Sequence, residues 1–224
     1  MAKTLARPQL HVEGIDDQHS LVNLLMRNGV GYVPGDVKLV KAPPELPEFL
    51  PARGVETLID LVETAVMTST GRPVGFVLDA DSPMVDRWRQ MQARLNNVGV
   101  DAPADRPPTE GFLGTSTKYQ TKVGVWVMPD NERDGKLENF LTDLIAPDDV
   151  LIDHVRKATA EARSLGAAFS DPDVVKAEVH AWLAWQEEPG KPYGQAVMAK
   201  YFQHDSPAAT RFVAWFRRLY DLGG

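Results

Sequence analysis

Short apolar runs alternate with helically spaced apolar residues along the first half of the chain. The runs end at Val12 and occupy residues 37–40, 74–78 and 123–128, and bounded runs of this length are typical of strands buried in a parallel sheet. Between them, amphipathic segments predict helices from Asp16 or Asp17 to Asn28-Gly29, over 54–67 and over 83–96. The Pro-rich stretches 43–51 and 101–108 are predicted loops. This order of elements predicts a doubly wound α/β fold.

Beyond residue 135 the apolar spacing becomes helical throughout. Helices are predicted around 137–144 and over 150–165, 173–185, 193–201 and 207–219. We therefore expect a core domain over residues 1–145 and a helical C-terminal extension over 146–224 that packs on it. Eight aromatic residues are expected to pack these helices rather than to line a ligand site: Trp182, Trp185, Tyr193, Tyr201, Phe202, Phe212, Trp215 and Phe216.

The composition is that of an ordinary soluble globular protein, with 43% hydrophobic and 25% charged residues among 224. The chain has no cysteine, no apolar run long enough for a membrane span and no export signal. We therefore expect a cytoplasmic protein without disulfides or thiolate metal sites. The formal net charge of −7 argues against long-range, nonspecific capture of nucleic acid, but it leaves room for a local basic surface.

Acidic residues follow two of the predicted strands. Glu13 and then Asp17 come after the first strand, while Asp79 and Asp81 follow the apolar run at 74–78. Because ligands of open α/β sheets bind beyond the carboxyl ends of the strands, we expect these acids to converge there. Gathered carboxylates repel one another unless a cation or shared protons neutralise them, and Mg²⁺ favours oxygen ligands. The pattern predicts a Mg²⁺ site, with Asp79 and Asp81 on one side by strand alternation.

Four motifs together carry a resemblance that covers the chain from about residue 9 to about residue 220. They are Val12-Glu13-Gly14-x-x-Asp17, Asp79-x-Asp81, segment 126–131 with Gly135-x-Leu137-Glu138, and segment 181–192. With them the chain resembles a Toprim-like family of bacterial proteins catalogued as a domain of unknown function, related to the Toprim domains of nucleases, primases and topoisomerases. The resemblance implies a Toprim-like (Rossmannoid) parallel-sheet core with helices on both faces and a helical C-terminal part.

The resemblance also implies chemistry. Toprim enzymes use the strand-end Glu and the Asp-x-Asp pair, together with Mg²⁺, to form or cleave phosphodiesters. Carried over, Glu13 is a metal ligand or general acid/base, and Asp79 and Asp81 hold Mg²⁺ or Mn²⁺. Glu138 resembles the later acidic residue of the nuclease branch and would complete a second metal site.

The acidic residues also have structural alternatives. Glu13 and Asp17 could cap the following helix, and Asp79 and Asp81 could be plain turn residues at the end of a strand. Glu138 could equally be a solvated residue of a first helical turn.

Three accessory features remain open. Asp130 either makes an Asx turn with Asn131 or lies near a metal. His19, or His11, could assist proton transfer beside the acidic motif. Four lysines could neutralise a phosphate or simply face solvent: Lys118, Lys122, Lys136 and Lys191.

Two functions fit these features. The first is a Mg²⁺-dependent phosphodiester-cleaving protein that acts on DNA or RNA, in bacterial defence or nucleic-acid maintenance. The alternative is a non-catalytic Toprim-like module that binds a metal, a nucleotide or a protein partner. Neither involves a membrane, and both leave a homo-oligomer open. A lysine and arginine surface beside Asp79 would favour the nuclease, whereas an occluded acidic pocket would favour the module.

Overall fold

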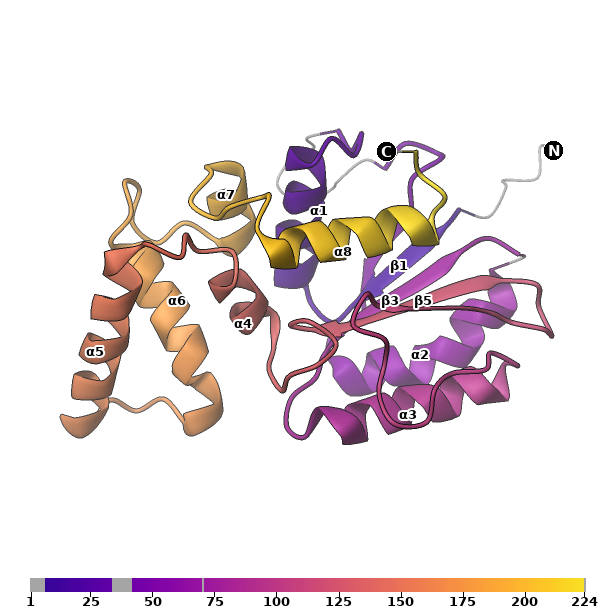
Figure 1. Ribbon diagram of the computed structural model, residues 1–224, viewed down its shortest axis with the longest axis horizontal. Helices are drawn as coiled ribbons and strands as arrows, with labels where there is room; N and C mark the ends of the chain where they lie inside the picture. The colour runs from indigo at the N-terminus through magenta and orange to yellow at the C-terminus, as the bar shows by residue number, and fades with distance from the viewer. Residues whose placement is uncertain (1–6, 34–41, 70, 224) are drawn as a thin grey trace.

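The computed structural model describes residues 7–33, 42–69 and 71–223. Its centre is a five-stranded sheet in the order β2-β1-β3-β5-β4 (Figure 1). The strands are β1 (Gln9–Val12), β2 (Glu48–Pro51), β3 (Val74–Asp79), β4 (Phe112–Thr115) and β5 (Lys122–Met128). β2, β1, β3 and β5 are parallel, and β4 is antiparallel to β5. The predicted α/β architecture is confirmed as a mostly parallel, Rossmann-like sheet.

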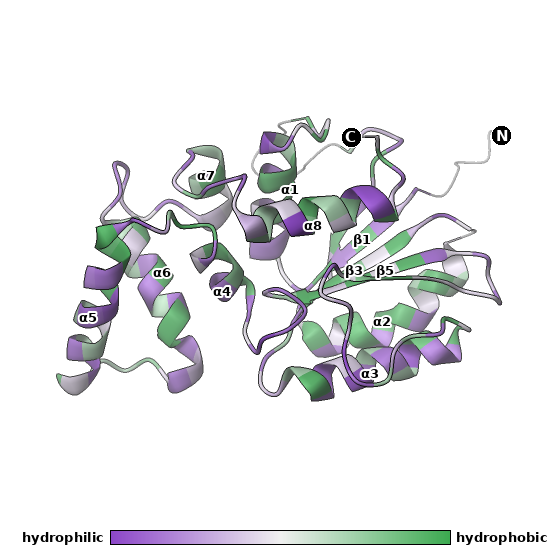
Figure 2. Cartoon of the chain, viewed as in Figure 1, coloured by the Kyte–Doolittle hydropathy of each residue, from purple (hydrophilic) through white to green (hydrophobic). Residues whose placement is uncertain are grey.

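Helices cover both faces of this sheet. One face carries α1 (Ile15–Arg27) and α8 (Pro207–Leu219), and the other carries α2 (Val55–Thr68) and α3 (Met84–Asn97) (Figure 1). The central strands alternate accordingly. Phe76, Leu78 and Val125 belong to the core under α2 and α3, whereas Val77 and Trp126 belong to the core under α1 and α8. In Figure 2 the strands are mainly hydrophobic, while the surrounding helices carry both hydrophobic and hydrophilic residues, as amphipathic helices do.

The strand order reverses between β1 and β3. From β1 the chain passes through α1 to β2 on one side, and from β2 it passes through α2 to β3 on the other side. In such sheets the reversal opens a crevice at the carboxyl ends of the two strands, where ligands bind. Glu13 directly follows β1, and Asp79 is the last residue of β3. The topology therefore places these two acids at the reversal, as the strand-end pattern predicts.

The remaining helices follow β5. They are α4 (Leu137–Thr142), α5 (Val150–Ser164), the 3₁₀ turn η1 (Asp171–Asp173), α6 (Val174–Ala184) and α7 (Tyr193–Met198). α5 and α6 pair side by side and project from the body of the protein (Figure 1). α8 returns to the sheet, where the Trp126 ring lies 5.4 Å from that of Phe212 and 5.8 Å from that of Trp215. The boundary at residue 145 stays a prediction.

α8 approaches the sheet closely because two glycines pair beneath it. Gly75 of β3 and Gly124 of β5 are register partners. A Cβ at Gly124 would lie 2.6 Å from Leu219 Cδ2, and one at Gly75 would lie 2.7 Å from the Tyr220 hydroxyl. The absence of side chains at this pair lets α8 pack directly on the strand backbone.

Some sequence predictions differ from the structure. The stretch 43–51 contains β2, which is an edge strand and so tolerates proline, and β4 was not predicted because Gly114 interrupts a run of only four residues. Trp185 is 46% exposed and lies on the His154 ring, so it is not part of the predicted aromatic core. The predicted strand at 37–40 lies outside the described residues. Within the described ranges, no helix has the length and apolar character needed to cross a membrane.

Candidate functional site

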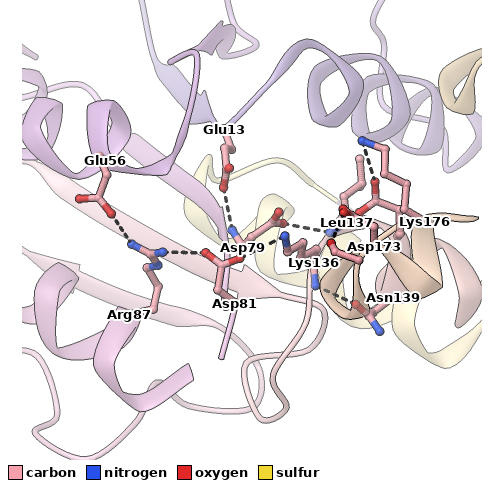
Figure 3. Close-up of polar contacts among 12 residues, drawn as sticks. Glu13, Glu56, Asp79, Asp81, Arg87, Lys136, Leu137, Asn139, Asp173 and Lys176 are labelled. Carbon is pink, nitrogen blue, oxygen red and sulfur yellow. Dashed lines mark hydrogen bonds and ion pairs between the residues drawn. The ribbon is translucent and has the colours of Figure 1, made fainter. Parts of the chain in front are cut away.

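Glu13 and Asp79 lie together at the strand reversal (Figure 3). The Glu13 carboxylate accepts a hydrogen bond from the Asp79 backbone N–H, with a distance of 3.3 Å between Oε2 and N. Asp79 Oδ1 in turn accepts the Leu137 N–H, at the first turn of α4, over 2.9 Å. Asp79 therefore fastens α4 to the end of β3, which is a structural role in addition to its place at the site.

Asp17 reaches the same region from the first turn of α1. Its Oδ2 accepts the Gly14 N–H over 2.9 Å, which caps the helix as the structural alternative predicts. The residue is only 6% exposed. Its Oδ1 is buried and has no hydrogen-bond partner among the described residues. A buried carboxylate oxygen without a hydrogen bond destabilises the folded state unless another group or an ion interacts with it.

We call Glu13, Asp17, Asp79 and Glu138 together the acidic cluster. Their carboxyl groups interact electrostatically. Burial is the largest cause that raises the pKa of Asp79 well above its usual value, followed by the charges of Asp17, Glu13 and Glu138. Burial, and then the charge of Glu13, raises the pKa of Asp17 to about 7. Burial also raises the pKa of Glu13, against the hydrogen bond from the Asp79 N–H. The cluster is therefore unfavourable when fully ionised and bare.

Asp81 lies beside the cluster but is already paired with cations. β3 ends at Asp79, and Asp81 has a left-handed backbone (φ 54°) that exchanges two hydrogen bonds with Gly135. Its carboxylate lies 2.6 Å from an Arg87 guanidinium nitrogen and 3.5 Å from Lys136 Nζ (Figure 3). The argument that strand alternation points Asp79 and Asp81 to one side therefore does not apply, because β3 ends at Asp79.

Glu138 sits in the first turn of α4, as predicted. Its side chain is 13% exposed, and its Oε1 lies 3.9 Å from Lys176 Nζ of α6. Because the charge of Glu138 contributes to the raised pKa values of Asp79 and Asp17, it belongs electrostatically to the cluster.

The Asp130 carboxylate accepts hydrogen bonds within the turn that follows β5. It accepts the N–H groups of Glu132 (3.0 Å) and Arg133 (2.9 Å), and the Arg133 guanidinium Nε at 2.5 Å. Burial acts to raise the pKa of Asp130, but these hydrogen bonds outweigh it and the pKa is lowered. The Asx-turn alternative accounts for Asp130 fully.

His19 and three of the four candidate lysines make structural contacts, whereas the fourth lysine lies at the cluster. His19 packs on the backbone of Gly194 in α7. Lys118 donates to a backbone carbonyl, and Lys122 and Lys191 pair with surface carboxylates. Lys136 contacts Asp81 and is thus the lysine of the four that lies at the cluster.

Sequence reasoning missed several residues at the site. Arg87 follows Asp81 by six positions on α3, so a basic residue early in the next helix was an available signal. Lys176 of α6 lies near Glu138, and burial together with the charge of Glu138 raises the pKa of Tyr193 of α7. No local pattern in the sequence indicates either interaction.

The side chains of the acidic cluster are of the kind that binds hard cations, but they are not arranged around a common point. Carboxylate oxygens are the ligands that Mg²⁺ prefers. Among the residues that the structure describes, however, no three His, Cys, Asp or Glu side chains are arranged to hold one metal ion. A cleft of about 490 Å³ opens next to the cluster, lined in part by Asp81, Lys136 and Pro172 of η1.

Asp17→Asn is expected to raise the melting temperature measured in chelator at and above neutral pH. The variant removes a buried charge, while its amide oxygen still accepts the Gly14 N–H. An acid whose pKa rises from 3.8 to about 7 on folding destabilises the protein above the folded pKa, and this cost disappears as the pH falls toward the unfolded value. The two melting curves should therefore converge in acid.

Asp130→Asn is the matched control for this change. It makes the same substitution at a carboxylate whose pKa is lowered, so it should lower the melting temperature at neutral pH. If Asp17→Asn instead loses as much stability as Asp130→Asn, the Asp17 charge is stabilising and the electrostatic description of the cluster is wrong.

Comparison with known proteins places the chain in a family. No curated protein and no solved structure matches it. A family model does match, over residues 7–221, which is nearly the whole length. The chain therefore belongs to the family described as protein of unknown function (DUF3226).

Proposed function

We propose that this protein is a Toprim relative that cleaves nucleic-acid phosphodiesters with Mg²⁺ or Mn²⁺ at the acidic cluster. The observation that carries the proposal is Asp17 Oδ1, a buried carboxylate oxygen that has no hydrogen-bond partner in the described part of the chain and that interacts with the charges of three further carboxylates. A divalent cation would satisfy this oxygen and remove the mutual repulsion in one step. The position of Glu13 and Asp79 at the strand reversal gives independent support.

Each residue then has a defined task. Glu13, Asp17 and Asp79 would hold the ion once their side chains turn toward a common point, and Glu138 would complete the set. When bound, such an ion neutralises phosphate oxygens and activates a water. Glu13, which directly follows β1 at the strand reversal, is the group we assign to accept the proton from the attacking water.

Asp81 takes a different role in this proposal from the one that the resemblance implies. Its two cation contacts would have to break before it could bind a metal. We assign Asp81 the task of holding Lys136 at the rim of the cleft, where the ammonium group can meet a substrate phosphate.

A non-catalytic binding module is the second candidate. Two observations favour it. The acids are not assembled around a common point in the described structure, and the charge of Asp81 is neutralised by Arg87. The net charge of −7 also leaves long-range attraction of nucleic acid weak.

Metal binding at the acidic cluster tests the basis of the nuclease proposal. In calorimetric titrations with Mn²⁺, the wild type should bind and the double variant Asp17→Asn/Asp79→Asn should not. Asparagine keeps the acceptors for the Gly14 and Leu137 N–H groups, so the fold should survive.

The control is Asp101→Asn/Asp105→Asn, which removes the same charge from an exposed loop. This control should bind Mn²⁺ as the wild type does. Equal binding by the wild type and the Asp17/Asp79 double variant would rule out the acidic cluster as the metal site.

A further inference from the structure

The cleft of about 490 Å³ beside the acidic cluster is built from three segments that lie far apart in the sequence. Asp81 and Ser82 follow β3, residues 134–136 precede α4, and Pro172 belongs to η1. Ligand pockets typically have volumes of about 300–1,000 Å³. The cleft therefore has room for a small molecule or for one unit of a polymer.

The two carboxylates that line the cleft already have partners. Asp134 Oδ1 accepts the Met84 N–H over 2.8 Å, and its Oδ2 accepts the Ser82 hydroxyl over 2.7 Å. Asp81 lies between two basic side chains (Figure 3). These contacts offset part of both negative charges, so the cleft repels an anion less than two free carboxylates would.

Two side chains of the cleft keep hydrogen-bond donors for a ligand. Asn139 Oδ1 accepts the Lys136 backbone N–H over 2.9 Å (Figure 3), which holds the amide and leaves its Nδ2 without a partner among the described residues. In the same part of the chain, Lys136 Nζ contacts only Asp81, although an ammonium group carries three donor hydrogens. Such donors favour a ligand rich in acceptor oxygens, and the charge of Lys136 favours an anion.

An isolated phosphate would use only part of this cleft. Pro172 adds an apolar ring to the lining, next to the polar groups. Ligand sites typically combine apolar surface with a few polar groups that fix the orientation of the ligand. A phosphate joined to a flat ring, as in a nucleotide, would use both the donors and the apolar surface.

We propose that the cleft binds one nucleotide unit, with the phosphate on Lys136 and Asn139 and the base against Pro172. The choice of a nucleotide rests on the proposed function, which brings nucleic acid to this edge of the sheet. The binding itself needs no metal ion, so it does not depend on how the acidic cluster is arranged. A free mononucleotide and an unpaired strand offer the same chemistry.

Calorimetric titrations in chelator test the site with orthophosphate, thymidine monophosphate and a single-stranded oligothymidylate. The wild type should bind thymidine monophosphate more tightly than orthophosphate, because only the nucleotide has a ring to place against Pro172. Binding of the strand as well identifies a substrate strand as the ligand, whereas binding of the nucleotide alone identifies a free nucleotide. Equal affinities for orthophosphate and the nucleotide, or no binding of any probe, would overturn the proposal.

Two substitutions assign the binding to the cleft. Lys136→Gln should weaken nucleotide binding about tenfold or more, the usual loss for a hydrogen bond to a charged group. The fold should survive, because Asp81 keeps its contact with Arg87. Asn139→Asp keeps the acceptor for the Lys136 N–H and replaces the Nδ2 donor with a negative oxygen, so it should also weaken binding.

Lys157→Gln is the matched control, because it removes the same charge from an exposed position of α5. Its affinity for thymidine monophosphate should equal that of the wild type. Equal losses in Lys136→Gln and Lys157→Gln would mean that net charge governs binding, and would overturn the proposal.

Failure of this inference can be told apart from failure of the proposed function. A protein that binds the nucleotide through Lys136 but cleaves no nucleic acid keeps the nucleotide site and loses the nuclease activity. A protein that cleaves nucleic acid but binds no probe in chelator keeps the nuclease activity and loses the nucleotide site.

Discussion

Glu13→Gln is expected to reduce metal-dependent cleavage of nucleic acid by about 100-fold or more, the usual range for loss of a general base. The substitution removes a charge and a proton acceptor at the end of β1. The fold should be spared, because the glutamine carbonyl can accept the Asp79 N–H that Glu13 Oε2 accepts over 3.3 Å. The melting temperature in chelator should stay unchanged or rise, since burial raises the pKa of Glu13 and so disfavours its charge.

Glu56→Gln is the control for this result. Glu56 is an exposed residue of α2 that pairs with Arg87 at 3.1 Å, so the same chemical change occurs near the site but outside the cluster. Its cleavage rate should stay close to that of the wild type. Equal losses in Glu13→Gln and Glu56→Gln would mean that net charge, and not a base at Glu13, controls the rate.

Phe212→Ala is expected to lower the free energy of unfolding by about 3–5 kcal/mol, as large truncations in packed cores do. Phe212 of α8 is fully buried. Its ring packs edge-on against Trp126 of β5 at 5.4 Å and against Phe140 of α4 at 5.9 Å. The cavity would therefore open where the helical C-terminal part joins the sheet, and urea unfolding measures the loss.

Leu165→Ala is the comparison for Phe212→Ala, because Leu165 is 80% exposed just after α5. Its free energy of unfolding should stay within about 0.5 kcal/mol of the wild type. A similarly small effect of Phe212→Ala would contradict the description of α8 as part of the main core.

The central strands were predictable, whereas the edges of the sheet were not. β3 and β5 are buried on both faces, so residues 74–78 and 123–128 read as continuous apolar runs. β2 and β4 have four residues each, are edge strands, and contain proline or glycine. Such strands depend on their neighbours in the sheet for stability, and this dependence leaves little local pattern.

The same distinction applies to the site. Glu13 and Asp79 could be predicted to meet, because both follow strands whose carboxyl ends share one edge of a parallel sheet. The pairing of Asp81 with Arg87 depends on a left-handed turn at Asp81, and Glu138 meets Lys176 only because α4 packs against α6. Contacts between distant segments leave no periodic signal along the chain, so these parts required the structure.

Incubation of the purified protein with single-stranded, double-stranded and structured nucleic acids tests the central claim most directly. Each substrate is tested with Mg²⁺, with Mn²⁺ and with chelator, and the products are separated on a denaturing gel. The metal-dependent function predicts cleavage of at least one substrate with either metal, none in chelator, and none by Glu13→Gln. If every substrate stays intact with both metals, the protein is not a nuclease, and the non-catalytic binding module takes its place.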